Sequence, residues 1–490
     1  MIQSASPKVV PQLIDRTDQH LILGAGFVGL GMAQALQAAG IAYDQVDASD
    51  QIGGNWYHGV YQTAHIISSR KVTQFTHFPM PADYPDFPSA AQMRDYLNAF
   101  AEHFNLRPAI ELNCAVLEVR PIENNHWQVT FANGEQRIYK GVLLCNGHHW
   151  DKSFPQFQGE FNGEIIHSKD YKHPDQLRGK RVLVIGGGNS ACDIAAEAAR
   201  VGVKSVLSLR ESVWFLPKTF AGTPVTDLIR GWMPELLQRL LAYGIIRLTF
   251  GKHEDYGLAK PTYRIFEKHP TLNNEVPYYI QHGRIQPKPA VRQLKGDRVE
   301  FVDGSCEAFD LIVCATGFHV SYPFLPPALQ RTEGAIVKCY GSCFLDDYKG
   351  IYYIGWGQAR GGVGSLIAAY GPFFARCLKL QDEINIPLGL VLKEMGQQFP
   401  KTHLGDPHAA FRQLKVATLG FSWLTRKAHQ VDREYADFQN TPLISIKNPH
   451  HIDQKLVSEE TDLTPKLEPN PTIALLYRDS APPSKGFPEA

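Results

Sequence analysis

The chain has 490 residues, of which 44% are hydrophobic and 20% are charged. This length suffices for two or three domains that each have a hydrophobic core. The 49 Lys and Arg balance the 49 Asp and Glu, so no excess charge points to nucleic acid or an anionic membrane as a partner.

The first residues and the apolar runs bear on where the protein resides. The start, Met1-Ile-Gln-Ser-Ala-Ser-Pro, lacks the basic residues and the long apolar segment of a signal peptide. No apolar run approaches the ~20 residues that cross a bilayer. The 19 His form none of the short His patterns of a metal site. We therefore expect a cytoplasmic protein with no membrane partner, no nucleic acid and no bound metal.

The first motif is a glycine fingerprint for a dinucleotide. An apolar strand precedes Gly24-Ala25-Gly26, and Gly29 lies in the helix that follows. Such glycines let the backbone approach a pyrophosphate at the N-terminus of the helix. Asp47 ends the next predicted strand, about 20 residues further on, where a carboxylate accepts hydrogen bonds from free ribose hydroxyls. The pattern predicts a site for FAD or NAD.

A second fingerprint begins after an apolar strand at 181–185. Gly186 and Gly188 form its turn, and Asn189 and Ser190 begin its helix. Small residues at these positions let the helix pack closely against the strand, as dinucleotide binding requires. The chain therefore carries two predicted dinucleotide sites.

The residue that meets the second ribose has the opposite charge from the first. Arg210 takes the place in the second unit that Asp47 takes in the first. A guanidinium suits a 2′-phosphate, which NADP carries and NAD lacks. Lys218, in the same segment, supplies a second positive charge. We expect FAD in the first site and NADPH in the second, which together indicate an electron-transfer enzyme.

The remaining elements predict an α/β fold with two Rossmann-like domains, the NADPH-binding one inserted into the FAD-binding one. A third buried strand, at 351–355, returns the chain to the first domain. Other expected elements are a helix at about 90–104 and strands at 112–119, 126–131 and 137–145. The predicted parts are a leader (1–17), the FAD domain (18–155 and 318–400), the NADPH domain (156–317) and a C-terminal extension (401–490) with a partly disordered tail.

Further short motifs lie around the fingerprints. They are Gly53-Gly54-Asn55-Trp56, Phe75-Thr-His-Phe-Pro-Met-Pro81, Phe161-Asn-Gly-Glu-Ile-Ile-His167-Ser-Lys-Asp-Tyr171, Asn189-Ser190 with Asp193, and Ala315-Thr316-Gly317. Taken together, they resemble the flavin-containing monooxygenase family, in its branch that oxygenates nitrogen and sulfur. The resemblance covers about 20–380, and His77 stands where the family has Asp.

The resemblance implies an NADPH- and O2-dependent flavin monooxygenase. FAD reduced by NADPH would form a C4a-hydroperoxyflavin that oxygenates a soft nucleophile, such as an amine or a sulfide, in a site that excludes water. Gly54, Asn55, Trp56 and Gly317 would then contact FAD, and Thr316 would contact NADPH. A small-molecule substrate and O2 are the expected partners, and a homodimer is compatible with this interpretation.

His167 lies in the connector between the two fingerprints. A single His is most often a hydrogen-bonded structural residue, and we favour that role here. A role in coupling the two domains is the second interpretation, because the connector lies where the domains would hinge.

One position departs from the family pattern. The family has an Asn eight residues before the position of Phe75, where oxygen reacts, and here that residue is Ile67. An apolar side chain neither donates nor accepts a hydrogen bond. Ser68 and Ser69 adjoin it and would replace the Asn after a small shift of register. If they do not, the chain would act as an NADPH oxidase that releases H2O2.

Three other functions stay open. A Baeyer–Villiger monooxygenase acting on ketones would usually have Trp in the place of Tyr171, which disfavours it. A disulfide reductase needs paired thiols, and Cys339 and Cys343 lack the spacing of a thiol redox motif. The non-enzymatic alternative is a sensor that binds FAD and NADPH without turnover.

Overall fold

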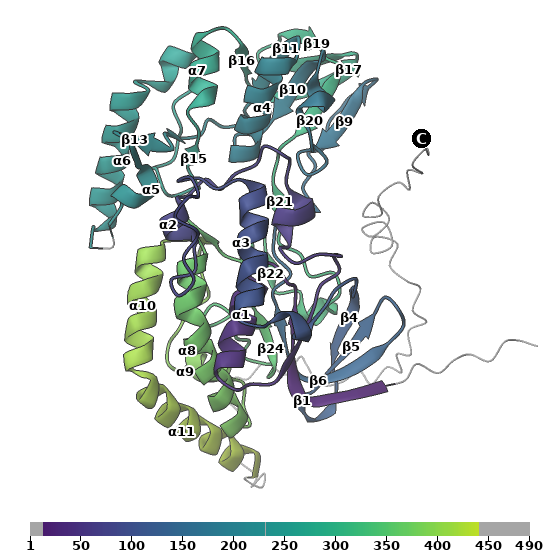
Figure 1. Cartoon of the computed structure of the whole chain (residues 1–490), viewed down its shortest axis with the longest axis vertical. Helices are drawn as coiled ribbons and strands as arrows, with labels where there is room; N and C mark the ends of the chain where they lie inside the picture. Colours follow the sequence, from purple (N-terminus) through teal and green to yellow (C-terminus); the bar gives the residue numbers. More distant parts are fainter. Residues whose placement is uncertain (1–12, 231, 441–490) are drawn as a thin grey trace, which may run out of the picture.

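The computed structural model describes residues 13–230 and 232–440. Its elements form two lobes, one above the other in Figure 1. The first lobe contains residues 13–150 and 320–440, and the second lobe contains residues 154–317. The second lobe is therefore an insertion in the first, and the predicted α/β fold is confirmed.

The first lobe is built on a seven-stranded sheet. Its strands are β1 (Leu13–Leu23), β2 (Tyr43–Val46), β3 (Ile110–Glu111), β4 (Val116–Pro121), β5 (Trp127–Phe131), β6 (Gln136–Leu144) and β24 (Ile351–Tyr353). The order is β3-β2-β1-β6-β5-β4, and β24 pairs with the second half of β6. The strands β3, β2, β1, β6 and β24 are parallel, and consecutive residues are buried in β24 and in the second halves of β1 and β6.

Helices cover this sheet and supply most of its core. They are α1 (Phe27–Ala38), α2 (Arg70–Thr73), α3 (Ala90–His103), α8 (Gly364–Glu383), α9 (Leu388–Glu394), α10 (Pro407–Leu419) and α11 (Phe421–Asn440). Helix α3 agrees closely with the helix predicted at about 90–104. Ser89 and Gln92 form a capping box, which defines where this helix begins. Helices α1 and α8 pack tightly, since a Cβ on Gly371 would lie 2.6 Å from the Cβ of Ala35.

The second lobe has a five-stranded parallel sheet in the order β16-β11-β10-β20-β9. Its strands are β9 (Glu164–His167), β10 (Arg181–Ile185), β11 (Lys204–Ser208), β16 (Ile285–Lys288) and β20 (Leu311–Cys314). A smaller sheet lies beside it, made of β8 (Gly159–Phe161), β17 (Val291–Gly296), β18 (Arg298–Phe301) and β19 (Cys306–Ala308). The helices are α4 (Asn189–Val201), α5 (Val225–Leu228), α6 (Glu235–Thr249) and α7 (Glu275–Gln281).

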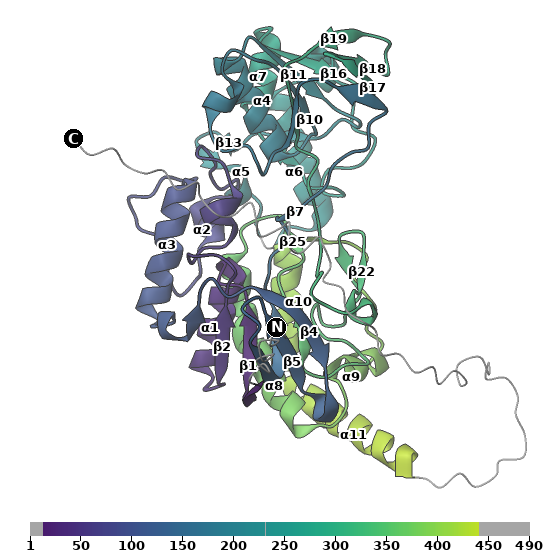
Figure 2. The same ribbon diagram turned by 90° about the vertical axis from the view of Figure 1, so that its right-hand side faces the viewer.

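Two chain crossings join the lobes. Strand β7 (Asp151–Lys152) leaves the first lobe and β21 (Phe318–His319) returns to it, and the two pair as an antiparallel ribbon. Figure 2 shows β7 between the lobes. A paired ribbon limits how the lobes rotate, because each crossing segment restrains the other.

The first lobe differs from its predicted bounds at both ends. Strand β1 begins at Leu13 and pairs with β6 from that residue, so residues 13–17 belong to the sheet and not to a leader. At the other end, α10 packs beside α8 (Figure 1), and α11 buries one apolar face in the core through Phe421, Leu424, Ala428 and Val431. Residues 401–440 are thus part of the first lobe. The predicted disordered tail and residues 1–12 lie outside the described residues.

Candidate functional site

The first glycine fingerprint forms a tight turn between β1 and α1. Gly24 has φ +113°, and a Cβ there would lie 2.4 Å from the carbonyl oxygen of Cys145. A Cβ on Gly29 would lie 1.9 Å from the carbonyl oxygen of Gly24. Both positions therefore exclude any side chain, and the N-terminus of α1 stays open to an anion.

Asp47 lies directly beyond β2 and is hydrogen bonded to this turn. Its Oδ2 accepts from the Ala25 N–H at 2.6 Å, and its Oδ1 accepts from the Ser49 N–H at 2.8 Å. Burial raises the pKa of the Asp47 carboxyl, and the two backbone hydrogen bonds oppose that shift. Each carboxylate oxygen has a second lone pair, so Asp47 can still accept a ribose hydroxyl.

The Gly53-Gly54-Asn55-Trp56 segment lies against the same turn. The Gly53 N–H donates to the Ala25 carbonyl oxygen at 3.1 Å, and a Cβ on Gly54 would lie 3.0 Å from the Cα of Gly26. A single π-helical turn, Asn55–Gly59, follows. The structure thus brings together the predicted flavin residues of the two motifs. Gly317 lies at the ribbon between the lobes, where its carbonyl oxygen accepts from the Ser153 N–H and lies 3.0 Å from Nε2 of His167.

The second fingerprint forms an equivalent turn between β10 and α4. Gly186 has φ +133°, and a Cβ there would lie 2.2 Å from the carbonyl oxygen of Ala315. Gly188 caps α4 with no atom within 4 Å of the position of a Cβ, so the helix N-terminus is accessible. Asn189 is used internally, because its Oδ1 accepts from the Leu272 N–H at 2.9 Å. The hydroxyl of Ser190 hydrogen bonds to Tyr61 of the first lobe.

The two predicted partners of the 2′-phosphate lie in different environments. Arg210 follows β11, its side chain is exposed, and within residues 13–230 and 232–440 it has no hydrogen-bond or ion-pair partner. Lys218 is half-buried, and its ammonium contacts Nε2 of His65 from the first lobe. Burial lowers the pKa of Lys218. Arg210 is thus available to a nucleotide, whereas Lys218 is held at the junction of the lobes.

His167 holds the ribbon between the lobes. Its side chain is fully buried, and Nε2 lies 3.0 Å from the carbonyl oxygen of Gly317. Nδ1 accepts from the Lys169 N–H at 3.1 Å, so Nε2 carries the proton and donates to Gly317. Burial lowers the pKa of His167, which favours this neutral form. Both ring nitrogens are satisfied, which supports the structural role that we favoured.

Thr316 contributes to the same ribbon. Its hydroxyl donates to the carbonyl oxygen of Ser153, and the Ser153 N–H donates to Gly317 at 3.0 Å. Thr316 and Gly317 therefore lock the returning crossing segment to the outgoing one. Whether they also contact NADPH and FAD stays a prediction.

The three residues around the missing Asn all have partners. Ile67 packs against an apolar cluster of the second lobe that includes Trp214 and Leu272. The Ser68 hydroxyl lies 2.8 Å from the Thr73 hydroxyl, and the Ser69 hydroxyl donates to Asp227. Both hydroxyls already have a partner in this structure, and whether either takes the place of the Asn amide stays a prediction.

Sequence reasoning missed His148. Its Nδ1 donates to the carbonyl oxygen of Gly355 at 3.1 Å, and Gly355 packs against Val28 in the first turn of α1. The other ring nitrogen, Nε2, is buried and has no hydrogen-bond partner among the described residues. A buried acceptor without a partner next to a glycine cradle fits a bound ligand that donates to it. In the sequence, the one feature that could have pointed to His148 as a ligand-binding residue was its position shortly after the strand that forms β6.

The cysteines and the potential metal ligands are further groups that could carry chemistry. Cys339 and Cys343 are buried free thiols, and burial raises the pKa of Cys339 to about 12. Both groups are therefore protonated near neutral pH and poorly suited to thiol exchange. No cluster of three or more potential metal ligands occurs within the described ranges. No helix among the described residues has the length and apolar character to cross a membrane.

Residues 18–385 match the family model "Flavin-binding monooxygenase-like". The chain belongs to the flavin-binding monooxygenase-like family. Curated relatives include dimethylaniline monooxygenase (N-oxide-forming) 2 of Macaca mulatta, 31% identical over 353 residues, and flavin-containing monooxygenase 2 of Homo sapiens, 32% identical over 353 residues. Each alignment covers 66% of this chain, and the chain spans 66% of the length of these relatives.

Solved structures of family members share the fold. A flavin-containing monooxygenase from Stenotrophomonas maltophilia has a TM-score of 0.57 at 19% identity, covering 74% of this chain and 98% of that one. An ε-caprolactone-bound cyclohexanone monooxygenase has a TM-score of 0.64 at 16% identity. The match covers 82% of this chain and 98% of the cyclohexanone monooxygenase chain. These likenesses establish the two-lobe fold of flavin-binding monooxygenases for this chain.

Proposed function

We propose that the chain is an NADPH- and O2-dependent flavin monooxygenase. The first lobe would hold FAD and the second would hold NADPH. The observation that carries this proposal is the pair of glycine cradles with opposite ribose partners, Asp47 in one and the unpaired Arg210 in the other. When bound, FAD would accept electrons from NADPH and react with O2 to oxygenate a soft nucleophile, an amine or a sulfide.

The residues of the chain would bind and align the two nucleotides. The N-termini of α1 and α4 present free N–H groups to the two pyrophosphates. Asp47 would accept the ribose hydroxyls of FAD, and Arg210 would donate to the 2′-phosphate of NADPH. The ribbon locked by His167 and Thr316 would hold the two lobes at a fixed spacing for electron transfer.

The proposal is tested by spectroscopy of the purified flavoprotein. Anaerobic NADPH should bleach the flavin, and admitting air should produce a transient absorbance distinct from oxidised and reduced flavin. Turnover of methylated amines and thioethers should then follow. Binding of FAD and NADPH without bleaching would indicate a sensor. Conversion of cyclic ketones to lactones, with amines untouched, would indicate a Baeyer–Villiger enzyme.

An NADPH oxidase is the second candidate, and Ile67 favours it. The family position for a polar side chain is apolar here, and the neighbouring hydroxyls of Ser68 and Ser69 already have partners. Without a polar group at that point, reduced flavin would pass its electrons to O2 with release of H2O2. The ratio of H2O2 released to NADPH consumed, with and without an amine, separates the two candidates. A ratio near one under both conditions favours the oxidase.

A further inference from the structure

Residues 61–69 of the first lobe run along the second lobe, and five of their side chains make the contacts that matter here. The five contacting residues are Tyr61, Thr63, His65, Ile67 and Ser69. The intervening Ile66 and Ser68 face the first lobe, in its apolar core and in a hydrogen bond to Thr73 respectively. We call residues 61–69 the docking segment.

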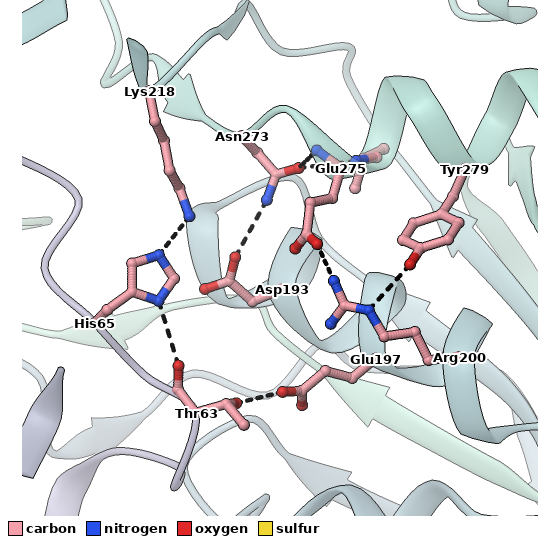
Figure 3. A network of polar contacts seen from close by, with 10 residues as sticks. Thr63, His65, Asp193, Glu197, Arg200, Lys218, Asn273, Glu275 and Tyr279 are labelled. Carbon is pink, nitrogen blue, oxygen red and sulfur yellow. Dashed lines mark hydrogen bonds and ion pairs between the residues drawn. The ribbon is translucent and has the colours of Figure 1, made fainter. Parts of the chain in front are cut away.

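Two polar contacts of the docking segment reach helix α4, and Figure 3 shows the one between Thr63 and Glu197. The Tyr61 hydroxyl donates to Asp193 at 2.7 Å, and the Thr63 hydroxyl donates to Glu197. Asp193 and Glu197 are four residues apart, so they lie on one face of α4. Lys218 adds a third contact by donating to Nε2 of His65.

Glu197 is the most constrained of these groups. It is 5% exposed, one carboxylate oxygen accepts from Thr63, and the other accepts from Tyr171 of its own lobe. A buried carboxylate without hydrogen bonds is costly, so each of these donors is needed. The Thr63 hydroxyl therefore satisfies a buried charge that belongs to the opposite lobe.

The docking segment also connects the two glycine cradles directly. The motif just before it is anchored to the first cradle, where the Gly53 N–H donates to Ala25. The segment itself is bonded to α4, whose N-terminus is the second cradle. A short stretch of chain thus spans the distance between the two predicted nucleotides, independently of the ribbon that joins the lobes.

We propose that the docking segment positions the two nucleotides for electron transfer, with Thr63 and Glu197 as the principal positioning pair. This inference rests on the proposed function, because it concerns electron transfer between the two bound nucleotides. The hydroxyl of Thr63 is engaged by Glu197, so Thr63 is a positioning residue. It acts by fixing α4, and with it the second cradle, against the first.

The test compares Thr63→Val, which removes the hydroxyl and keeps the shape, with Thr63→Ser, which restores it. Gln62→Ala is the matched control, because the neighbouring Gln62 side chain is exposed. In anaerobic stopped-flow experiments, Thr63→Val should slow flavin reduction by NADPH about tenfold, the effect of one hydrogen bond worth ~1.4 kcal/mol. Reduction by dithionite and FAD content should not change, and Thr63→Ser and Gln62→Ala should match the wild type.

A second measurement does not depend on cofactor chemistry. Hydrogen–deuterium exchange should increase in 61–69 and in α4 for Thr63→Val and for Glu197→Gln. Glu197→Gln also changes the contact with Tyr171, so the informative comparison is the effect of Thr63→Val in the two backgrounds: it should raise exchange less in Glu197→Gln than in the wild type. Additive effects would overturn the pairing.

The two possible failures are distinguishable. If NADPH does not bleach the wild-type flavin, the proposed function is wrong and only the exchange data bear on docking. If the wild type is bleached but Thr63→Val reduces at the wild-type rate, the docking segment does not position the nucleotides. Equal loss of NADPH and dithionite reduction would also overturn the proposal, because it would indicate damage to the flavin site.

Discussion

The charge of Arg210 gives a direct test of which nucleotide the second lobe binds. The neighbouring Glu211 is already paired, because Lys268 contacts its carboxylate and the Thr262 hydroxyl donates to it at 2.8 Å. Arg210 itself has no partner within the described ranges and is exposed. Replacing it by Ala therefore removes no contact of the folded chain, and the free energy of unfolding should change by less than about 0.5 kcal/mol.

The expected loss of affinity follows from the bond that Arg210 would make. A hydrogen bond to a charged group is worth about 1.5–3 kcal/mol. Arg210→Ala should therefore weaken NADPH binding roughly 10- to 100-fold. NADH lacks the 2′-phosphate, so its binding should stay nearly unchanged. Arg210→Lys keeps the charge but loses the planar guanidinium with its paired donors. Its affinity for NADPH should therefore lie between those of the wild type and Arg210→Ala.

The assay is the dependence of anaerobic flavin reduction on NADPH and NADH concentration. Arg247→Ala is the control, because Arg247 is also exposed, lies on α6 and changes the net charge equally. It should leave both cofactors unaffected. Equal weakening of NADPH and NADH by Arg210→Ala would refute the assignment of Arg210 to the 2′-phosphate.

Three further predictions concern buried groups. Burial lowers the pKa of His20 from 6.5 to about 4, so between these values the unfolded chain binds more protons and stability falls with falling pH. The loss should total about 3 kcal/mol, and His20→Gln should reduce this pH dependence in urea titrations at pH 7.5 and 4.5. His167→Leu, which removes the donor to Gly317, should lower the free energy of unfolding by about 1 kcal/mol. His167→Gln should keep most of the wild-type stability. Replacing Cys339 and Cys343 by Ala should leave flavin reduction by NADPH intact. Loss of flavin reduction in this variant would favour the disulfide reductase hypothesis.

The sequence predicted those parts of the site that are formed by residues close together in the chain. Gly24 and Gly186 were identifiable because a strand, a tight turn and a helix follow one another within a short stretch of chain. The place of Asp47 at the end of β2 follows from the same local geometry. The predicted buried strand at 351–355 indicated that the second domain is inserted in the first, and β24 pairs with β6 as that arrangement requires.

The parts that sequence reasoning missed depend on contacts between distant segments. Lys218 was assigned to the nucleotide because it follows Arg210 in the chain, yet its ammonium contacts His65, 153 residues away in sequence. Helix α11 was placed in a separate extension, although its buried face completes the core of the first lobe. Glu197 offered one usable signal: it is a charged residue among alanines on an otherwise apolar helix face. Such a residue requires a partner, but the sequence does not show which.

The docking segment gives a physical reason for the departure at Ile67. Tyr61, Thr63 and His65 supply polar contacts to the second lobe, and Ser69 bonds to Asp227. Ile67 lies between them and packs against an apolar cluster of that lobe, which suits an apolar side chain better than an Asn amide. The requirement for docking therefore opposes the requirement for a polar group near the oxygen-reacting position. In this chain the docking requirement prevails, so oxygen transfer would have to rely on groups other than residue 67.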